Sequence, residues 1–531
     1  QISRLNNKRI VFNRIGSRIK YFILLFILIS YTLFLAFSLR GEICSNLNEK
    51  NYFPSLSDRP FTEDGFYMMT AAWNIAEGKG IKYNLNRPTT GIQPLFTFIQ
   101  AAVAKAVLIS GGNKIDFLRT LIMFSSLIFI FFGYTAAKII QQLVPPVITK
   151  IFPLFLAWFS FDLYAYFNNG LETGFYLLMI ALCIYYSLKF FENPGYKYAG
   201  LFGVLCGLTS LTRIDFILPA SIYFFLILIN KKAKVYKIIV AGSAAVILIL
   251  PWIFYIFTVS GSIFPTSVSA QASFISGSNL GGRSYGLLNA LLQHFSPFIY
   301  SYNIYLCLIL SLIFYLLFAF YAKKFYFISI FGKQSLNNFR LWGISFLSLP
   351  AAYFIFSFAY YFYDRYTVPV YLFIFIIISS FSIFIFSKYY IQYRKFFLAG
   401  FLLLFFVQAF YYQLMPKSPD TFALRAGFIK KHFEDTRRIG LFQSGTAGFF
   451  NENVLNLDGK MDHVAGNYAL NGKIERFIDS MKIDVLIEWR DAFENFNKEY
   501  FKKNWKLYKN DIGDGRTACY VRLSKNLKEK N

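Results

Sequence analysis

The stretch KKAKVYK at 231–237, followed by IIVAGSAAVILILPWIFYIF at 238–257, indicates what class of protein this chain is. The second stretch carries no charged side chain and is as long as a helix must be to cross the hydrocarbon core of a bilayer, about 20 residues. The lysines before it are typical of a loop on the cytoplasmic side of a membrane. We therefore interpret 238–257 as a spanning helix whose first end is cytoplasmic.

Apolar runs of this kind recur along the whole chain. Its 531 residues are 56% hydrophobic and 21% aromatic, which is more apolar surface than one soluble core would bury. The first run could be a signal peptide, but its length and the lack of a small-residue cleavage site favour a retained helix. We expect about eleven spanning helices, at 20–39, 117–137, 147–166, 171–191, 198–212, 215–230, 238–257, 302–322, 341–360, 367–387 and 396–414.

The distribution of charge predicts how these helices are oriented. A net charge of +26 could suggest a nucleic-acid partner, but the basic residues lie in short segments between apolar runs, so we expect none. By the positive-inside rule the basic segments and the N-terminus are cytoplasmic, and the C-terminal end lies outside. The predicted outer loops, which are poor in Lys and Arg, are 40–116, 167–170, 213–214, 258–301 and 361–366.

One further apolar stretch, 92–110, is not counted as a span. Counting it would invert every later loop and break the alternation of charge. We expect it to lie along the outer interface as an amphipathic helix, with Gln100 and Lys105 facing the lipid headgroups.

The composition changes near residue 416, where Pro416 and Pro419 follow the last apolar run. Acidic and basic residues alternate from there on, as they do on a solvated surface. The sequence predicts strands at 439–442, 454–457, 484–488 and 518–523 and a helix at 473–481. The fold class expected is thus an all-α polytopic membrane bundle, residues 1–415, with a soluble C-terminal α/β domain, residues 416–531.

The glycines of the segment 445–448, Gly-Thr-Ala-Gly, follow a predicted strand. They lack the Lys-Ser/Thr pair of a P-loop and the third glycine of a dinucleotide fingerprint. We therefore interpret the segment as a tight strand-to-helix turn.

Adjacent carboxylates stand in the first predicted outer loop. Glu63 and Asp64 open a predicted helix for which Thr62 is a candidate N-cap. Acidic residues are common in the first turn of a helix because they interact well with its dipole, so this pair has an ordinary structural explanation. A carboxylate next to another also has a raised proton affinity, which suits a general base.

The outer loops resemble those of the GT-C superfamily of glycosyltransferases, in the branch that includes protein mannosyltransferases, the lipid A aminoarabinose transferase and mycobacterial arabinofuranosyltransferases. The first loop has the acidic pair and Tyr67, then Asn74 to Gly80, then Gly91 to Leu95. Later matches are Asn169 to Thr173, Leu211 to Asp215, Arg365 to Pro369, Gln443 to Gly445 and Asn456 to Gly459.

The resemblance implies an inverting glycosyltransferase of the inner membrane that takes part in cell-envelope biogenesis. Its donor would be a polyprenyl-phosphate sugar, and its acceptor a glycan, lipid or protein hydroxyl on the extracytoplasmic, periplasmic side. The acidic pair supplies the catalytic base: alignment through Tyr67 favours Glu63, whereas the prevalence of Asp in that role favours Asp64. No cofactor is certain, and a divalent cation held by Glu63 and Asp64 is an open alternative.

Further side chains in these motifs are candidates for donor or acceptor binding. For the donor phosphate we propose Arg87, Arg213 and Arg365, because arginine stays charged and can bind two oxygens. The structural alternatives are an ion pair of Arg213 with Asp215 and one of Arg365 with Asp364. The full candidate set is Tyr67, Arg87, Gln93, Glu172, Arg213, Asp215, Arg365 and Tyr366.

Two departures from the family pattern remove potential cations near the donor phosphate. Gln93 stands where the family often has His or Lys, and the segment 265–271 ends in Gln where the family has Lys. A transporter or flippase, and a polymerase or ligase of lipid-linked glycans, are the competing functions. A transporter is expected to carry charges at mid-membrane and interrupted, matched halves, which this sequence does not display.

Overall fold

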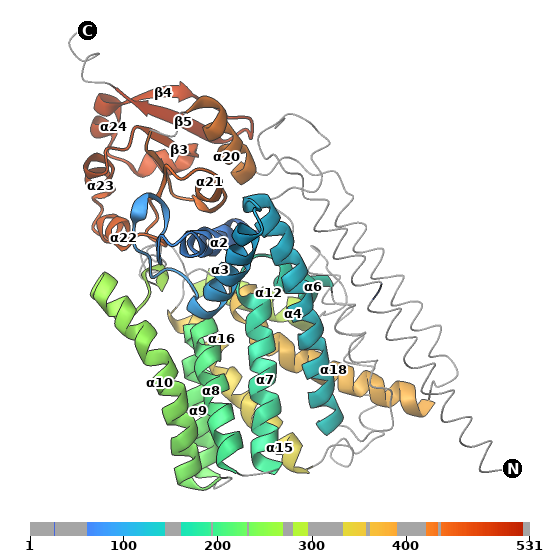
Figure 1. The fold of residues 1–531 in the computed structure, drawn as a ribbon. Coiled ribbons are helices and arrows are strands. Elements are labelled where there is room, and N and C mark those ends of the chain that lie inside the picture. Colours follow the sequence, from blue (N-terminus) through green and yellow to red (C-terminus); the bar gives the residue numbers. More distant parts are fainter. Residues whose placement is uncertain are drawn as a thin grey trace, which may run out of the picture.

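The structure, a computed structural model, describes most of the helical region and nearly all of the C-terminal region. A helical bundle lies at one end of the molecule and a small sheet at the other, with two further helices between them (Figure 1). The described residues are 26, 61–143, 161–192, 195–230, 233–268, 280–295, 333–356, 362–389, 421–433 and 437–523.

The bundle is built from helices that are apolar on most of their surface. Four described stretches are long and apolar enough to cross a membrane: Lys114–Leu143, Thr173–Glu192, Val235–Ser260 and Asn337–Phe356. Shorter apolar helices are Pro94–Ile109, Ile214–Ile229 and Val368–Ile377. The helices are α4 (Lys114–Leu143), α6 (Phe161–Asn168), α7 (Thr173–Glu192), α8 (Tyr196–Thr212), α9 (Ile217–Ile229), α10 (Val235–Ser260), α12 (Leu280–Phe295), α15 (Lys333–Phe346), α16 (Ser348–Phe356), α17 (Tyr363–Tyr366) and α18 (Val368–Tyr389).

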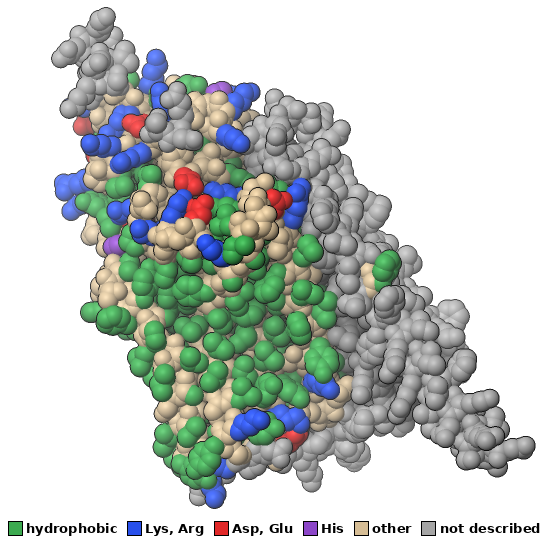
Figure 2. All heavy atoms as spheres, in the orientation of Figure 1, with side chains coloured by type: hydrophobic (Ala, Val, Ile, Leu, Met, Phe, Trp, Pro, Cys, Tyr) green, Lys and Arg blue, Asp and Glu red, His purple; other side chains and the backbone are tan. Residues whose placement is uncertain are grey.

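Hydrophobic side chains cover the visible face of the bundle, and charged side chains gather beyond both ends of that apolar belt (Figure 2). The apolar belt is the surface that a bilayer would cover. Of the predicted spans, 302–322 and 396–414 lie outside the described residues, as does all of 20–39 except Phe26 and most of 147–166. The other predicted spans correspond to helices, although the span at 341–360 is divided between α15 and α16.

Two helices of the first loop, α2 (Glu63–Ala76) and α3 (Pro94–Ile109), lie between the bundle and the sheet. Thr62 caps α2, as predicted, by accepting a hydrogen bond from the Gly65 N–H at 3.4 Å. Gly65 packs directly on the turn that precedes α7, where an added Cβ would lie 2.6 Å from the Asn169 carbonyl oxygen. Nearly every residue of α2 is buried. The start of α2 is therefore fixed by the bundle.

The expectation that Gln100 faces the headgroups is wrong. Its side chain is fully buried, and its Nε2 donates a hydrogen bond to the Gly170 carbonyl oxygen at 3.0 Å. Gly170 lies in the turn between α6 and α7, outside both helices, so its buried carbonyl oxygen is satisfied by a side-chain donor. Lys105 is exposed, and its Nζ donates to the Ala76 carbonyl oxygen at 3.1 Å, at the end of α2.

The C-terminal region contains a five-stranded sheet with strand order β2-β1-β3-β5-β4. β1 pairs in parallel with β2 and β3, whereas β5 pairs antiparallel with β3 and β4. The strands are β1 (Ile439–Leu441), β2 (Val454–Asn456), β3 (Val485–Trp489), β4 (Trp505–Lys509) and β5 (Thr517–Arg522). The helices around them are α20 (Thr421–His432), α21 (Gly445–Phe450), α22 (His463–Leu470), α23 (Ile474–Ser480) and α24 (Lys498–Asn504).

The four predicted strands and the predicted helix, now α23, are present with ends displaced by one residue or so. The strand that the sequence did not reveal is β4. It lies at the edge of the sheet, and all its residues after Trp505 are exposed. A half-buried strand is recognised by alternating apolar and polar residues, and the five residues of β4, Trp-Lys-Leu-Tyr-Lys, keep that alternation only over the first three.

Candidate active site

The carboxylate of Glu63 binds the start of α21, at the turn that follows β1. Its Oε1 accepts a hydrogen bond from the Gly445 N–H at 2.5 Å, and its Oε2 accepts from the Thr446 N–H at 2.8 Å and from the Thr446 hydroxyl at 2.5 Å. Burial raises the pKa of Glu63 to about 7, although these hydrogen bonds oppose the rise. The interpretation of 445–448 as a strand-to-helix turn is confirmed, and Glu63 supplies the acceptors that its free N–H groups need.

The backbone at this contact approaches closely enough to exclude a side chain. A Cβ added to Gly445 would lie 2.1 Å from the Glu63 carbonyl oxygen. Two tyrosines bind the neighbouring residue: the Tyr67 hydroxyl accepts from the Ser444 N–H at 3.0 Å, and the Tyr83 hydroxyl donates to the Ser444 carbonyl oxygen at 2.8 Å. The C-terminal region that contains the five-stranded sheet, which we call the sheet region, is thus docked on α2 through these polar contacts.

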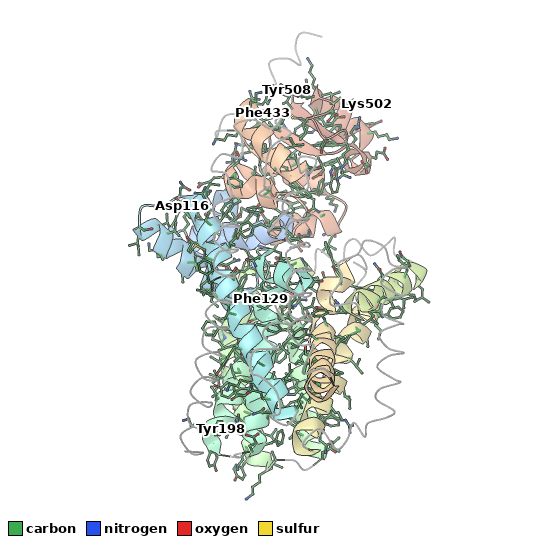
Figure 3. All side chains as sticks on the ribbon, turned by 90° about the vertical axis from the view of Figure 1, so that its right-hand side faces the viewer. Asp116, Phe129, Tyr198, Phe433, Lys502 and Tyr508 are labelled. Carbon is green, nitrogen blue, oxygen red and sulfur yellow. The ribbon has the colours of Figure 1, made fainter. Side chains whose placement is uncertain are left out.

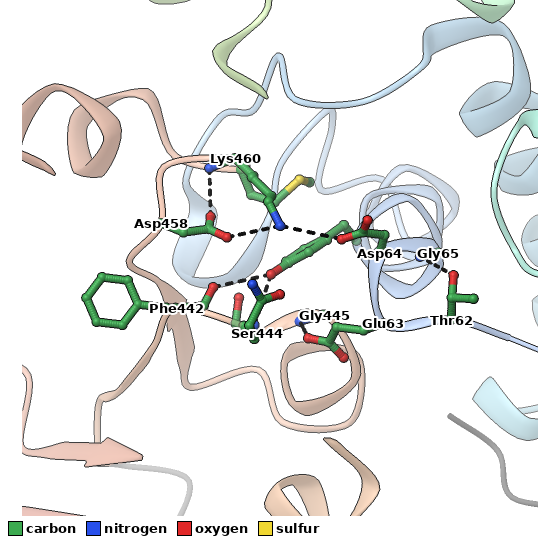
Figure 4. Close-up of polar contacts among 12 residues, drawn as sticks. Thr62, Glu63, Asp64, Gly65, Phe442, Ser444, Gly445, Asp458 and Lys460 are labelled. Carbon is green, nitrogen blue, oxygen red and sulfur yellow. Dashed lines mark hydrogen bonds and ion pairs between the residues drawn. The ribbon is translucent and has the colours of Figure 1, made fainter. Parts of the chain in front are cut away.

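Asp64, the next residue along α2, faces a different environment. Its Oδ2 lies 3.0 Å from Arg365 Nη1 and its Oδ1 lies 3.5 Å from Lys460 Nζ. Its side chain is 21% exposed. Burial alone would raise the pKa of Asp64, but Lys460 and Arg365 outweigh that effect and hold it below its ordinary value. Figure 4 shows Lys460 directed at Asp64 while Glu63 is directed at Gly445.

Lys460 is a site residue that the sequence analysis missed. Its Nζ also lies 3.4 Å from Asp458 Oδ2, and its N–H donates to Asp458 Oδ1 at 2.8 Å across a turn in which Gly459 has a φ of 79°. A signal was available, because Lys460 directly follows the family-like segment Asn456 to Gly459. Its pairing with Asp64, which lies 396 positions earlier in the chain, could not be predicted from the sequence.

A second charged cluster lies at the ends of α7 and α8. Arg213 Nη1 lies 2.9 Å from Glu172 Oε1, and Arg213 Nη2 lies 2.7 Å from Asp215 Oδ2 and donates to the Tyr353 hydroxyl at 3.0 Å. Tyr353 in turn donates to Asp215. The ion pair of Arg213 with Asp215, weighed as a structural alternative, is therefore present.

Tyr366 connects the two clusters. The guanidinium groups of Arg213 and Arg365 lie over its ring at 5.5 and 5.4 Å from the centroid, and Tyr353 stacks on it at 4.5 Å. Such cation–π contacts fix a guanidinium group without neutralising it. The alternative ion pair of Arg365 with Asp364 is not among the ion pairs of the described residues, and Arg365 pairs with Asp64 instead.

Arg87 and Gln93 are not brought into these clusters. Arg87 binds Asp462 through two hydrogen bonds, Nε to Oδ2 at 2.6 Å and Nη2 to Oδ1 at 3.0 Å. This bidentate pair is a further contact between the first loop and the sheet region. Gln93 is half-buried at the start of α3, where its side chain makes no capping hydrogen bond.

The two carboxylates proposed as metal ligands engage different partners, Glu63 with α21 and Asp64 with the two cations. Among the described residues there is no group of three or more His, Cys, Asp or Glu side chains placed to hold an ion.

No protein-family model matches the sequence, and no curated protein matches it. Solved structures, in contrast, are similar to the chain. The crystal structure of ArnT from Cupriavidus metallidurans in the apo state is similar over 95% of this chain and 98% of that chain, with a TM-score of 0.57 and 9% identity. A complex of an Archaeoglobus fulgidus oligosaccharyltransferase with Zn and sulfate covers 93% of this chain and 73% of that chain, with a TM-score of 0.46 and 11% identity.

The similarity to ArnT concerns the fold, and it extends over nearly the full length of both chains. The chain therefore has the GT-C fold of an integral membrane protein, with an apolar helical bundle followed by a soluble α/β region, as the sequence predicted.

Proposed function

We propose that this protein is an inverting glycosyltransferase that transfers a sugar from a polyprenyl-phosphate carrier to an acceptor hydroxyl on a cell-envelope glycan, glycolipid or protein. The observation that carries the proposal is Asp64, a partly exposed carboxylate between the apolar bundle and the polar sheet region, with a cation from each beside it. Such a junction suits a donor that has both a lipid tail and a water-soluble sugar. The GT-C fold and the resemblance of the outer-loop motifs support the same activity.

In this mechanism Asp64 is the general base. Its carboxylate accepts the proton of the acceptor hydroxyl while the acceptor oxygen forms a bond to the anomeric carbon. The bond from that carbon to the phosphate oxygen breaks, and its electron pair leaves with the polyprenyl phosphate. Attack in line with the leaving group inverts the anomeric centre. A phosphate leaving group needs cationic stabilisation rather than a proton donor, and Arg365 lies beside the base to supply it.

The geometry favours Asp64 over Glu63 as the base. Both oxygens of Glu63 already accept hydrogen bonds from α21, and the residue is buried, at 8% exposure. Proton transfer to Glu63 would compete with the contacts that dock the sheet region. Among the described residues, the Asp64 carboxylate pairs only with Arg365 and Lys460, and an incoming substrate can replace these ion pairs. We therefore assign Glu63 to positioning and Asp64 to chemistry.

The remaining motif residues are assigned roles around that centre. Glu172 and Asp215 neutralise Arg213, which holds Tyr366 and, through it, Arg365. The bidentate pair of Arg87 with Asp462 favours a docking role over phosphate binding. Tyr67 binds the loop after β1 and thereby aligns α2 with the sheet region.

We infer from the distribution of charge that the N-terminus is cytoplasmic and that Asp64 and the sheet region are extracytoplasmic. A sugar nucleotide would be available only in the cytoplasm, so the donor must have crossed the membrane on a lipid phosphate. The domain division proposed is 1–415 for the membrane part and 416–531 for the soluble part.

The test uses the purified protein in detergent with a panel of radiolabelled polyprenyl-phosphate sugars. Wild type is expected to release sugar to an acceptor or to water, and Asp64→Asn to bind donor without releasing it. Asp491→Asn, an exposed carboxylate of the sheet region, is the matched control and should be fully active. A parallel arm with EDTA, followed by Mg²⁺ or Mn²⁺, tests whether a divalent cation contributes. Donor binding by wild type without release across the panel would contradict the proposal and favour a transporter or flippase.

A further inference from the structure

The cations around the candidate site differ in how completely they are already bound. Arg87 is held by two hydrogen bonds to Asp462, and Arg213 is shared by Glu172, Asp215 and the Tyr353 hydroxyl. To turn to a new anion, each would have to give up two contacts of 3.0 Å or less to carboxylate oxygens. These two arginines are therefore poorly suited to bind a substrate phosphate.

The other two cations, Arg365 and Lys460, are less completely bound. Arg365 contacts Asp64 through Nη1, and its buried Nε has no hydrogen-bond partner. The contacts of Lys460 Nζ to Asp64 and Asp458, at 3.5 and 3.4 Å, exceed the roughly 2.7–2.9 Å of a strong charge-assisted hydrogen bond. Both cations can therefore gain by contacting an oxygen anion placed between them.

The backbone of Lys460 is fixed although its side chain is long. The Thr266 hydroxyl donates to the Lys460 carbonyl oxygen at 3.0 Å, and the Thr266 N–H is held by the Thr90 hydroxyl at 3.1 Å. Gly91 packs so tightly there that an added Cβ would lie 1.8 Å from the same carbonyl oxygen. The loop after α10 and the loop before α3 thus jointly place the backbone from which the Lys460 side chain extends.

Resting on the glycosyltransferase function proposed above, we propose that Lys460 and Arg365 together form the binding site for the phosphate group of the lipid-linked donor. Arginine matches two phosphate oxygens at once, and lysine adds a compact point charge on a flexible stem. One cation comes from the bundle and the other from the sheet region. The donor site is therefore complete only while the sheet region is docked on α2.

This arrangement couples donor binding to the base. Lys460 and Arg365 both lie against Asp64 in the free protein. A donor phosphate that takes over these two cations leaves the Asp64 carboxylate free to contact the acceptor hydroxyl.

The experiment measures binding of a polyprenyl monophosphate, and separately of the uncharged polyprenol of the same length, to the full-length protein in detergent. Lys460→Gln is expected to weaken monophosphate binding by roughly 10-fold or more, the effect of losing one charged hydrogen bond. Polyprenol binding should be unchanged, which shows that the lipid site is still folded. Lys460→Arg should retain most of the monophosphate affinity.

Lys502→Gln is the control variant, because Lys502 is exposed on the sheet region at the end far from the bundle (Figure 3). Equal monophosphate affinities for wild type and Lys460→Gln would overturn the role of Lys460 and leave the proposed function standing. A wild type that binds monophosphate no better than polyprenol would instead overturn the proposed function itself. A loss in Lys460→Gln that Lys460→Arg restores supports the phosphate site.

Discussion

Glu63 and Asp64 are neighbours on α2, yet their surroundings differ in hydrogen-bond partners, in charge and in exposure to solvent. Glu63 is enclosed by backbone N–H groups and a hydroxyl, and its pKa is raised to about 7 by burial. Asp64 is partly exposed between two cations, and its pKa is lowered. Successive residues of a helix point about 100° apart, so one helix can present one carboxylate to each region. An adjacent acidic pair thus need not act as a unit.

The difference between the two carboxylates should have its largest effect on the transfer rate. Asp64→Asn should lower the transfer rate by roughly 100- to 10,000-fold, the usual contribution of a general base. Glu63→Gln should retain much more activity, because it changes the docking contact and not the base. Initial rates and thermal melts of both variants provide the check, and an equal loss of rate in the two variants would break the distinction.

The next largest effect is expected on the Glu63 side, from Gly445→Ala. The added methyl group would lie 2.1 Å from a backbone oxygen, so α21 and α2 must move apart. We expect a destabilisation of about 1–3 kcal/mol, as for other overpacked sites, seen as a lower melting temperature and faster proteolysis of the sheet region. Gly200→Ala is the control, since nothing lies near its added Cβ. A melting temperature equal to that of the control would contradict the close docking.

The raised pKa of Glu63 predicts a pH effect. A carboxyl group that binds its proton more tightly in the folded state stabilises the fold at pH below its ordinary pKa of 4.5, and that stabilisation is lost as the pH rises through about 7. Wild type should therefore become less stable between pH 4.5 and 7, relative to Glu63→Gln, which cannot ionise. Thermal melts of the two proteins across this interval test the prediction, and parallel curves would refute it.

The smallest effect is expected from the pair of Arg87 with Asp462, which joins the same two regions. Asp462 is buried, but the side chain of Arg87 is 25% exposed, and without Arg87 the Asp462 carboxylate still accepts hydrogen bonds from the Val464 and Ala465 N–H groups. Arg87→Gln should cost about 1 kcal/mol or less and leave donor binding intact. A large loss of donor binding in this variant, measured with the polyprenyl monophosphate, would return Arg87 to the list of phosphate ligands.

The sequence predicted the parts of this molecule that depend on local pattern. Uninterrupted apolar runs indicated the spanning helices, and short apolar runs between turn residues located β1, β2, β3 and β5. The edge strand β4 was missed because its short sequence, Trp-Lys-Leu-Tyr-Lys, alternates only over three residues. Gln100 was misplaced because a polar residue in an apolar helix looks like a solvent-facing one, and its partner is a carbonyl group in another segment.

The sequence predicted which residues belong to the candidate site, but not which of them contact one another. The motifs supplied Asp64, Arg213 and Arg365, but their spacing could not reveal that Asp64, not Asp364, pairs with Arg365. Lys460 was missed for the same reason, since its contact with Asp64 joins two distant segments of the chain. Contacts of this kind depend on how domains dock, which no local pattern encodes.

The distance in sequence between Asp64 and Lys460 also has a consequence for the timing of biosynthesis. The two residues are separated by 396 positions, so a ribosome that adds about 5–20 residues per second makes the second roughly 20 to 80 s after the first. During that interval the first loop and the early helices exist without Lys460. With Lys460 and Arg365 as the proposed phosphate ligands, we expect a chain that has been synthesised only as far as the helical bundle to bind the donor phosphate weakly.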